Sequence, residues 1–385
     1  MSTTSVKPSA PRRAPAEFPA APATRRTTRI AISTGGGDAP GLNAVIRAAV
    51  LSALERGWEA CGIRRGFHGL LEDDELVPLT LETVRGIAHL GGTILRTSRN
   101  NPFHWRRRGV DGPTTGEDRS DEVLARLATH GVDAMISVGG DGTLRVAERL
   151  WKKGLNVVVV PKTIDNDISC TINTFGFDTA VSTAVEAIDR LHTTAESHDR
   201  VLVLEVMGRE AGFIALHSGV AAGADVVLIP EIPYDIDKVC DKIMARDRAG
   251  RSFSIVVVAE GATRTGGTAL ALEPTLPGQS IRLGGIADVI AREIQDRTGK
   301  ETRSLVLGHL QRGGVPTSYD RLLATRFGAA AVQAVADEMW GHMVALQSPH
   351  IVPVPIAEVL AQPRRVDPGH DIVRAARTTG ISFGD

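Results

Sequence analysis

Strand-like and helix-like segments alternate along most of this chain of 385 residues. Short runs rich in valine and isoleucine are followed by glycine-rich turns or by stretches with helical periodicity. This repetition predicts a mostly parallel sheet with helices on both faces. The predicted strands cover 30–33, 134–138, 157–160, 201–206, 226–229 and 255–259, and the main predicted helices cover 41–54, 144–151 and 179–194.

The number of strand-like runs indicates how the chain is divided. About ten strands are too many for one compact sheet, so we expect an α/β fold with two Rossmann-like lobes, mostly parallel sheets and an active-site cleft between the lobes. The first lobe is predicted to contain 30–176 and 311–361, and the second 177–310. Residues 1–29 are interpreted as a disordered extension and residues 362–385 as an irregular C-terminal extension.

Composition argues against several classes of function. A formal net charge of −1 gives no overall attraction to nucleic acid or to anionic membranes. No apolar run approaches the roughly 20 residues that span a bilayer. The three cysteines lack the spacing of a zinc site or a disulfide framework. We therefore expect a soluble, cytoplasmic protein with no nucleic-acid or membrane partner, although the arginines of 1–29 leave a targeting segment as an alternative.

Two glycine-rich turns follow predicted strands. Three adjacent glycines, Gly35 to Gly37, follow the first strand, and a Gly-Gly-Asp-Gly-Thr turn, residues 139–143, follows the strand at 134–138. Glycines let backbone amides approach phosphate oxygens at the start of a helix. A carboxylate among such amides needs a cation, so Asp141 is a candidate ligand for Mg²⁺ bound to phosphates, with helix capping as the alternative.

A pair of carboxylates follows the strand at 157–160. Asp165 and Asp167 lie in the loop Pro-Lys-Thr-Ile-Asp-Asn-Asp, residues 161–167, at the edge of the sheet where ligands bind in open α/β folds. In an extended loop the two side chains point the same way, so that one can accept a proton while the other raises its basicity or holds magnesium. An Asx turn would explain either residue alone.

Several arginines are placed to bind phosphate. Arg303, His309 and Arg312 bracket a short apolar strand, an arrangement that suits the gripping of one phosphate. Arg99 follows a Gly-Gly-Thr turn, and Arg209 follows Met207 and Gly208. The glycines beside these arginines indicate that the side chains belong to binding sites and are not simply solvated on the surface.

Taken together, these motifs resemble the 6-phosphofructokinase family over about residues 29–345. The resemblance implies transfer of a phosphoryl group to the 1-hydroxyl of fructose 6-phosphate. It implies that Asp165 is the base, supported by Thr163 and Asp167, with Arg209 also at the catalytic centre, and that Asp141 holds Mg²⁺. The implied donor-binding residues are Gly37, Arg99, Gly140, Gly142, Thr143 and Lys162. The implied substrate-binding residues are Arg200, Met207, Gly208, Arg209, Glu231, Arg303, His309 and Arg312.

The resemblance also implies an oligomer. In the family the site for the 6-phosphate commonly receives arginines from a neighbouring subunit, so we expect a homodimer or homotetramer with shared active sites.

Two positions of the chain bear on the choice of phosphoryl donor, and they favour different donors. Family members that use pyrophosphate usually have Asp where this chain has Gly142 and Lys at the position of Lys162, whereas members restricted to ATP usually have Gly at both. We expect ATP because Gly142 leaves room for a nucleotide, and we keep pyrophosphate as the alternative. The resemblance places Phe67 at an aromatic position beside the adenine, which agrees with ATP; packing in the core is the alternative.

Effector control is expected to be weak or absent. The basic effector pocket of bacterial relatives matches Arg47, Leu51, Asp74 and His192 here, so an apolar and an acidic side chain replace two cations.

Two other functions are alternatives. Lipid and NAD kinases share the Gly-Gly-Asp-Gly turn but lack the loop at 161–167. A catalytically inactive sugar-phosphate sensor should have lost Asp141, Asp165 or Asp167, and all three are present.

Overall fold

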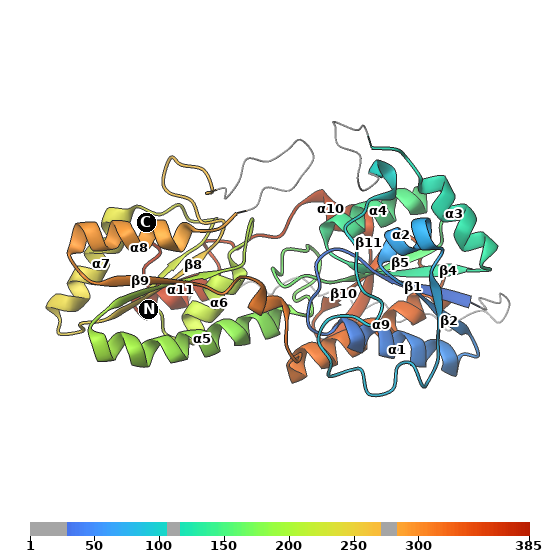
Figure 1. The fold of residues 1–385 in the computed structure, drawn as a ribbon, viewed down its shortest axis with the longest axis horizontal. Helices are drawn as coiled ribbons and strands as arrows, with labels where there is room; N and C mark the ends of the chain where they lie inside the picture. The colour runs from blue at the N-terminus through green and yellow to red at the C-terminus, as the bar shows by residue number, and fades with distance from the viewer. Residues whose placement is uncertain (1–28, 106–115, 271–282) are drawn as a thin grey trace, which may run out of the picture.

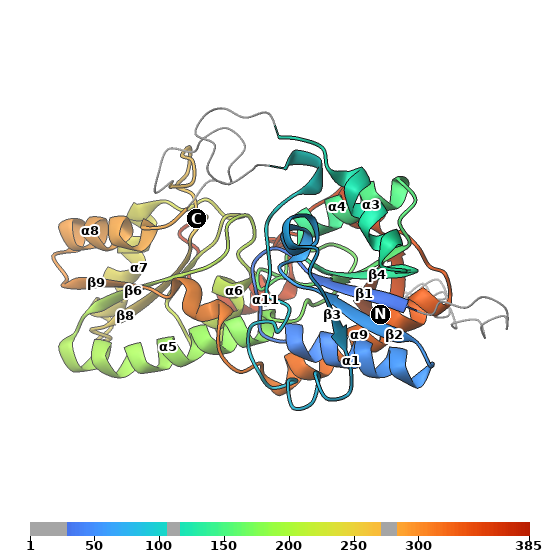
Figure 2. The ribbon, with the colours of Figure 1, turned by 45° about the vertical axis from the view of Figure 1, so that its right-hand side comes forward.

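The computed structural model describes residues 29–105, 116–270 and 283–385. Two α/β lobes lie side by side, one around a seven-stranded sheet and the other around a four-stranded sheet (Figures 1 and 2). The predicted α/β fold with two lobes and mostly parallel sheets is confirmed. The predicted disordered extension, residues 1–29, lies outside the described residues except for Arg29, which begins a strand.

The first lobe is built on a sheet with the strand order β11-β10-β5-β4-β1-β2-β3. Its neighbours pair in parallel except at the two edges, where β2 with β3 and β10 with β11 are antiparallel. The strands are β1 (Arg29–Thr34), β2 (Glu59–Ile63), β3 (Leu76–Leu79), β4 (Ala134–Gly139), β5 (Val157–Pro161), β10 (His342–Gln347) and β11 (His350–Pro355).

Helices cover both faces of this sheet. On one face, α1 (Leu42–Glu55) and α9 (Ser318–Ala336) pack together and share a core with β1, β4 and β5. On the other face lie α3 (Ser120–Thr129), α4 (Asp141–Lys152) and α10 (Ile356–Ala361). The central strands β4 and β5 are buried along their whole length, as expected for parallel strands covered on both sides.

The second lobe has four parallel strands in the order β7-β8-β6-β9. These are β6 (Val201–Val206), β7 (Val226–Leu228), β8 (Ser254–Ala259) and β9 (Thr302–Val306). One face carries α5 (Phe177–His198) and α6 (Phe213–Ala221), and the other carries α7 (Ile236–Arg248) and α8 (Ile286–Thr298).

The predicted irregular C-terminal extension, residues 362–385, is wrong. After α10 the chain crosses back to the second lobe and forms α11 (Asp371–Thr378), which lies in that lobe in Figure 1. Val373 and Phe383 are fully buried in the core that α5 and α6 share with the sheet. The sequence analysis missed this segment because its helix is short and only half apolar, so that tertiary contacts stabilise it: burial of apolar side chains and the pairing of Arg377 with Asp385.

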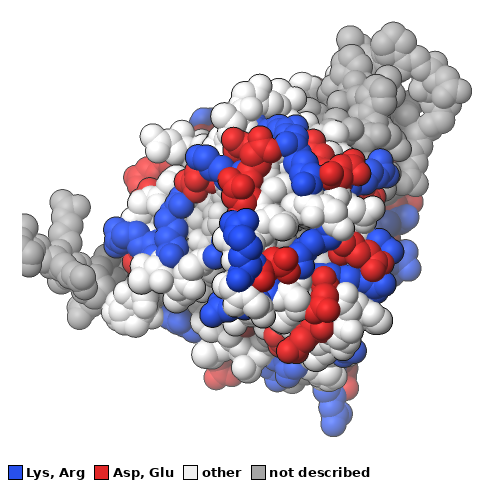
Figure 3. Space-filling view, turned by 90° about the vertical axis from the view of Figure 1, so that its left-hand side faces the viewer, with Lys and Arg blue, Asp and Glu red and all other residues white. Residues whose placement is uncertain are grey.

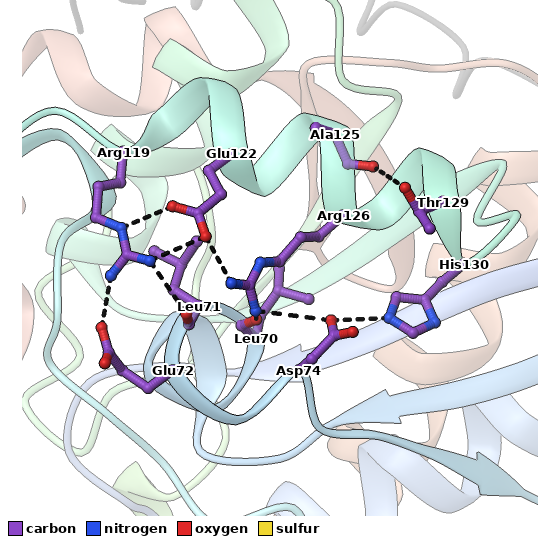
Figure 4. A network of polar contacts seen from close by, with 10 residues as sticks. All are labelled: Leu70, Leu71, Glu72, Asp74, Arg119, Glu122, Ala125, Arg126, Thr129 and His130. Atoms are coloured by element: carbon purple, nitrogen blue, oxygen red, sulfur yellow. Dashed lines mark hydrogen bonds and ion pairs between the residues drawn. The ribbon is translucent and has the colours of Figure 1, made fainter.

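Short helical turns connect β2 and β3 in the first lobe and pack against α3. They are α2 (Gly66–His68) and η1 (Gly69–Asp73). Figure 4 shows a polar network that joins η1 to α3. Its central member, Arg126, pairs with Glu122 and donates to the carbonyl of Leu70.

Asp74, one of the positions matched to the effector pocket, belongs to this network. Its carboxylate lies 2.9 Å from Nε2 of His130 and 3.8 Å from Arg126 (Figure 4). His192, another such position, contacts the carbonyl of Ala222 at 2.8 Å. Asp74 is exposed and His192 is half-buried, and both contact other groups of this chain. Weak effector control stays a prediction.

Charges are mixed on the exposed surface that Figure 3 shows. On this end of the second lobe, basic and acidic side chains of the described residues alternate over short distances. Among the described helices, none is long and apolar enough to cross a membrane.

The two lobes are joined where the N-terminal ends of α5 and α9 meet. The buried carboxylate of Asp320 accepts hydrogen bonds from the backbone N–H of Thr179 at 2.8 Å and from its hydroxyl at 2.6 Å. Thr317, the N-cap of α9, donates through its hydroxyl to Asp178 at 2.6 Å. The joint therefore fixes the start of α5, which carries the chain from the first lobe into the second.

Replacing Asp320 by alanine should destabilise the protein by about 1–3 kcal/mol, because it leaves two buried donors of Thr179 without an acceptor. Thermal and denaturant unfolding would measure the loss. Asp320→Asn keeps one acceptor oxygen and should unfold at a higher temperature than Asp320→Ala. Equal unfolding midpoints for wild type and Asp320→Ala would contradict this role.

Candidate active site

A cavity of about 380 Å³ lies at the carboxyl ends of β1, β4 and β5. It brings together most of the predicted donor-binding and catalytic side chains. The predicted site residues among its lining are Gly37, Arg99, Gly140, Asp141, Gly142, Thr143, Lys162, Thr163, Asp167, Arg209 and Arg312. Phe67, predicted to lie beside an adenine, also lines it.

Two glycines make room for one threonine at the start of α4. A Cβ atom on Gly35 would lie 2.8 Å from Oγ1 of Thr143, and one on Gly139 would lie 2.1 Å from the same atom. Thr143 is therefore held between the turns after β1 and β4. In contrast, a side chain at Gly142 would meet nothing within 4 Å, so this position opens onto the cavity.

The catalytic loop follows β5 and turns at Asn166. Asn166 has a left-handed backbone with φ of 54°, which is unusual for a residue other than glycine and costs about 1–2 kcal/mol. Its buried side chain offsets this cost by accepting a hydrogen bond from the backbone N–H of Thr174 at 3.0 Å. The turn places Asp165 and Asp167 on either side of it.

Thr163 links the two aspartates. Its hydroxyl oxygen accepts a hydrogen bond from the backbone N–H of Asp165 at 3.1 Å, and its hydroxyl is also hydrogen-bonded to the carboxylate of Asp167. The Oδ1 atom of Asp165 is buried and has no hydrogen-bond partner among the described residues. Asp165 therefore carries a free acceptor oxygen, as a general base requires.

Burial raises the pKa of Asp165 to about 6, and the neighbouring Asp167 adds to the rise. Three cations oppose it: Arg312, Arg209 and Lys162. Burial is also the main reason why the pKa of Asp167 is raised. A carboxylate that titrates near neutrality is suited to accept a proton from a hydroxyl group.

Lys162 and Arg312 both donate hydrogen bonds to the turn that follows β1. The buried ammonium of Lys162 donates to the carbonyl of Gly37, and burial, followed by the charge of Arg312, lowers its pKa to about 8. Arg312 donates to the carbonyl of Asp38 at 3.2 Å, and its buried Nε has no partner among the described residues. The cavity therefore concentrates positive charge beside the turn after β1.

Asp141 is the first residue of α4 and pairs with Arg145 one turn later. The nitrogens of Arg145 lie 2.9 and 3.1 Å from the two carboxylate oxygens, and both side chains are more than half exposed. Among the described residues no group of three or more His, Cys, Asp and Glu side chains could hold a metal by itself. A single carboxylate beside phosphates fits Mg²⁺, which keeps several waters and uses one or two carboxylates.

The predicted cluster of Arg303, His309 and Arg312 does not form within one chain. Arg303 lies at the start of β9, where it pairs with Glu301, and Arg312 lies beyond the other end, in η3 (Gly308–Arg312). A five-residue strand spans about 17 Å, too far for both to grip one phosphate. The apolar run forms a strand, as predicted, but the length of this strand separates the residues at its two ends.

Arg200 lies with Arg303, away from the cavity. It precedes β6 and pairs with Glu301 at 2.8 Å, whereas Arg209 follows β6 at the other end of the sheet. The exposed His309 also lies outside the described lining of the cavity.

Glu231, predicted to bind the sugar, is engaged elsewhere. Its carboxylate accepts from the backbone N–H of Gly212 at 3.0 Å and from that of Val366 at 2.8 Å, and it does not line the described cavity. Met207 and Gly208 do not line this cavity either; the backbone N–H of Met207 donates to the buried Gln311 at 3.3 Å.

The sequence analysis missed Glu260, directly after β8. Burial, followed by the charge of Asp165, raises the pKa of Glu260 to about 7, and its carboxylate is hydrogen-bonded to the backbone of Gly208. Glu260 is thus the acid that the second lobe contributes near the catalytic base. Glu260 could have been identified in the sequence because it follows the carboxyl end of a predicted strand, which is also how Asp165 was identified.

Comparisons with known proteins agree with this geometry. The family model described as phosphofructokinase matches residues 29–335. An ATP-dependent 6-phosphofructokinase from Chloroflexus aurantiacus is 52% identical over 93% of this chain and 98% of the relative. A pyrophosphate–fructose 6-phosphate 1-phosphotransferase from Amycolatopsis mediterranei is 53% identical over 88% of this chain and 96% of the relative.

Solved structures give the same result. The crystal structure of Pichia pastoris phosphofructokinase in the T-state is similar with a TM-score of 0.75 and 31% identity, over 94% of this chain and 38% of the Pichia chain. This chain thus spans less than half of the Pichia chain. Together with the glycine turns and the catalytic loop, these similarities show that the chain belongs to the phosphofructokinase family.

Proposed function

We propose that the protein transfers the γ-phosphoryl group of ATP to the 1-hydroxyl of fructose 6-phosphate, with Mg²⁺, in the cytoplasm. The observation that carries the proposal is the buried Oδ1 of Asp165, which has no hydrogen-bond partner among the described residues; its loop neighbours Thr163 and Asp167 line a cavity walled by two glycine turns. This arrangement combines an available base with a site for polyphosphate.

In the proposed mechanism Asp165 accepts the proton of the sugar 1-hydroxyl as its oxygen attacks the γ-phosphorus and ADP leaves. Lys162, Arg209 and Arg312 supply positive charge for the transferred group, since all three lie close enough to Asp165 to lower its pKa. Thr163 accepts a hydrogen bond from the backbone N–H of Asp165 and is hydrogen-bonded to the carboxylate of Asp167, so it holds the loop that carries both acids.

We propose that Asp141 holds the Mg²⁺. A bound Mg²⁺ would neutralise charge on the donor phosphates. Because both oxygens of Asp141 accept hydrogen bonds from Arg145, this arginine would compete with the metal for the carboxylate.

We propose ATP as the donor and pyrophosphate as the alternative. The open space at Gly142 supports a nucleotide, and the relatives include proteins named for each donor. Lys162 favours the alternative because its ammonium lies at the turn that would receive the phosphates.

For the sugar phosphate we propose Glu260 in place of Glu231, and a contribution of Arg200 and Arg303 from a neighbouring subunit. Both arginines lie at the amino ends of β6 and β9, remote from the cavity of their own chain. Exposed apolar side chains of β9, η3, the loop after η3 and the start of α9 support a homo-oligomer with shared sites. They are Leu305, Val306, Leu310, Val315, Tyr319 and Leu322.

The proposal is tested by measuring fructose 1,6-bisphosphate formation with Mg²⁺ and either ATP or pyrophosphate. The expected result is a higher kcat/KM with ATP. A higher kcat/KM with pyrophosphate would reverse the donor assignment, and binding of fructose 6-phosphate without turnover would favour a sensor.

Asp165→Asn should lower kcat about 10²–10⁴-fold while the KM values change little, because the variant keeps the shape of the loop but loses the base. Steady-state kinetics with both substrates would measure this. Asp189→Asn, at an exposed position of α5, is the matched control and should leave kcat unchanged. Full activity of Asp165→Asn would rule out Asp165 as the base.

The activity should depend on pH through Asp165. Its ionised form is the base, so kcat/KM should fall as the pH drops through about 6. Because the charge of Asp167 helps to raise this pKa, Asp167→Asn should move the acidic limb of the profile to lower pH. Profiles of kcat/KM against pH, measured for the wild type and for Asp167→Asn between about pH 5 and 8, would show the shift. An acidic limb at the same pH in both would contradict the coupling.

Gly142→Asp should reduce kcat/KM with ATP at least about tenfold and spare any activity with pyrophosphate, because the new side chain enters the open space beside the donor. Gly142→Ala is the control, since its methyl group meets nothing within 4 Å. Parallel assays with the two donors would measure the change. Equal losses with both would show that Gly142 does not select the donor.

A further inference from the structure

The segment that leads from α10 to the second lobe contacts the catalytic loop. The backbone N–H of Arg364 donates to the carbonyl of Asp167 at 3.1 Å. Its side-chain Nη1 donates to the carbonyl of Ile172 at 2.6 Å and to that of Asn166 at 3.3 Å. One arginine therefore binds three backbone carbonyls within seven residues of the loop.

The same segment is anchored in the second lobe. The guanidinium of Arg364 lies over the ring of Phe213, 4.7 Å from its centre, and Phe213 begins α6. Two residues further on, the buried Val366 donates through its backbone N–H to Glu231 at 2.8 Å. Arg364 thus links the catalytic loop of one lobe to the helix that follows Arg209 in the other.

The carbonyl of Asn166 belongs to the strained residue between the two aspartates. Its side chain holds the turn through Thr174 on one side, and Arg364 binds its backbone carbonyl. Hydrogen bonds from a charged donor are roughly twice as strong as neutral ones. Loss of Arg364 would leave the left-handed turn with one restraint fewer, and the positions of both carboxylates depend on this turn.

We propose that Arg364 is a positioning residue for phosphoryl transfer: it holds the turn of Asp165 and Asp167 and couples this turn to the second lobe. Arg364 acts through backbone carbonyls and does not touch the reacting groups. The inference rests on the proposed function, in which Asp165 is the base.

The test compares Arg364→Met, Arg364→Lys and Arg365→Met in the full chain. Methionine keeps an extended apolar side chain but has no donor, whereas lysine offers one charged nitrogen in place of Nη1. Arg364→Met should lower kcat about 10–100-fold, because small displacements of catalytic groups have effects of that order. The KM values and the calorimetric stoichiometry of fructose 6-phosphate binding should stay unchanged, and Arg364→Lys should recover most of the activity.

The control, Arg365→Met, removes a neighbouring arginine that is 58% exposed and reaches Glu210 only at 3.9 Å. It should behave as wild type. The proposal is overturned if Arg364→Met turns over as fast as this control, or if its kcat and its binding stoichiometry fall together, which would indicate a purely structural role. A wild-type protein without kinase activity would instead refute the proposed function itself.

Discussion

A buried carboxylate oxygen that has no hydrogen-bond partner in the described part of the chain is the constraint on which this site depends. Removing the charge of Asp165 from water is unfavourable, and the raised pKa of this residue reflects that cost. Lys162, Arg209 and Arg312 reduce the cost without removing it. The carboxylate of Asp165 therefore stays ionised near neutral pH and is still basic enough to accept a proton.

The surrounding cations come from distant parts of the chain, so the site exists only while the two lobes keep their relative position. Lys162 follows a strand of the first lobe, whereas Arg209 follows β6 of the second and Arg312 follows β9. The hydrogen bonds between Thr179 and Asp320, and the segment around Arg364, join the lobes beside this site. The packing between the two lobes therefore helps to determine the pKa of Asp165.

Much of the fold and of the donor site could be predicted from the sequence because local spacing determines them. The glycine turns and Asp165 follow buried parallel strands, whose carboxyl ends meet at one edge of the sheet. Contacts between distant segments were not predictable in this way. Arg303 and Arg312 are close in sequence but separated by a strand, and Phe383 is buried although its surroundings are polar in sequence.

The central claim is that Oδ1 of Asp165 receives the proton of the sugar, and a crystal structure with bound fructose 6-phosphate tests it most directly. The account predicts that the 1-hydroxyl oxygen lies about 2.6–3.2 Å from Oδ1, with its other side open toward the donor cavity. A sugar bound in full occupancy with its 1-hydroxyl directed away from Asp165, toward another acid such as Glu260, would contradict the account.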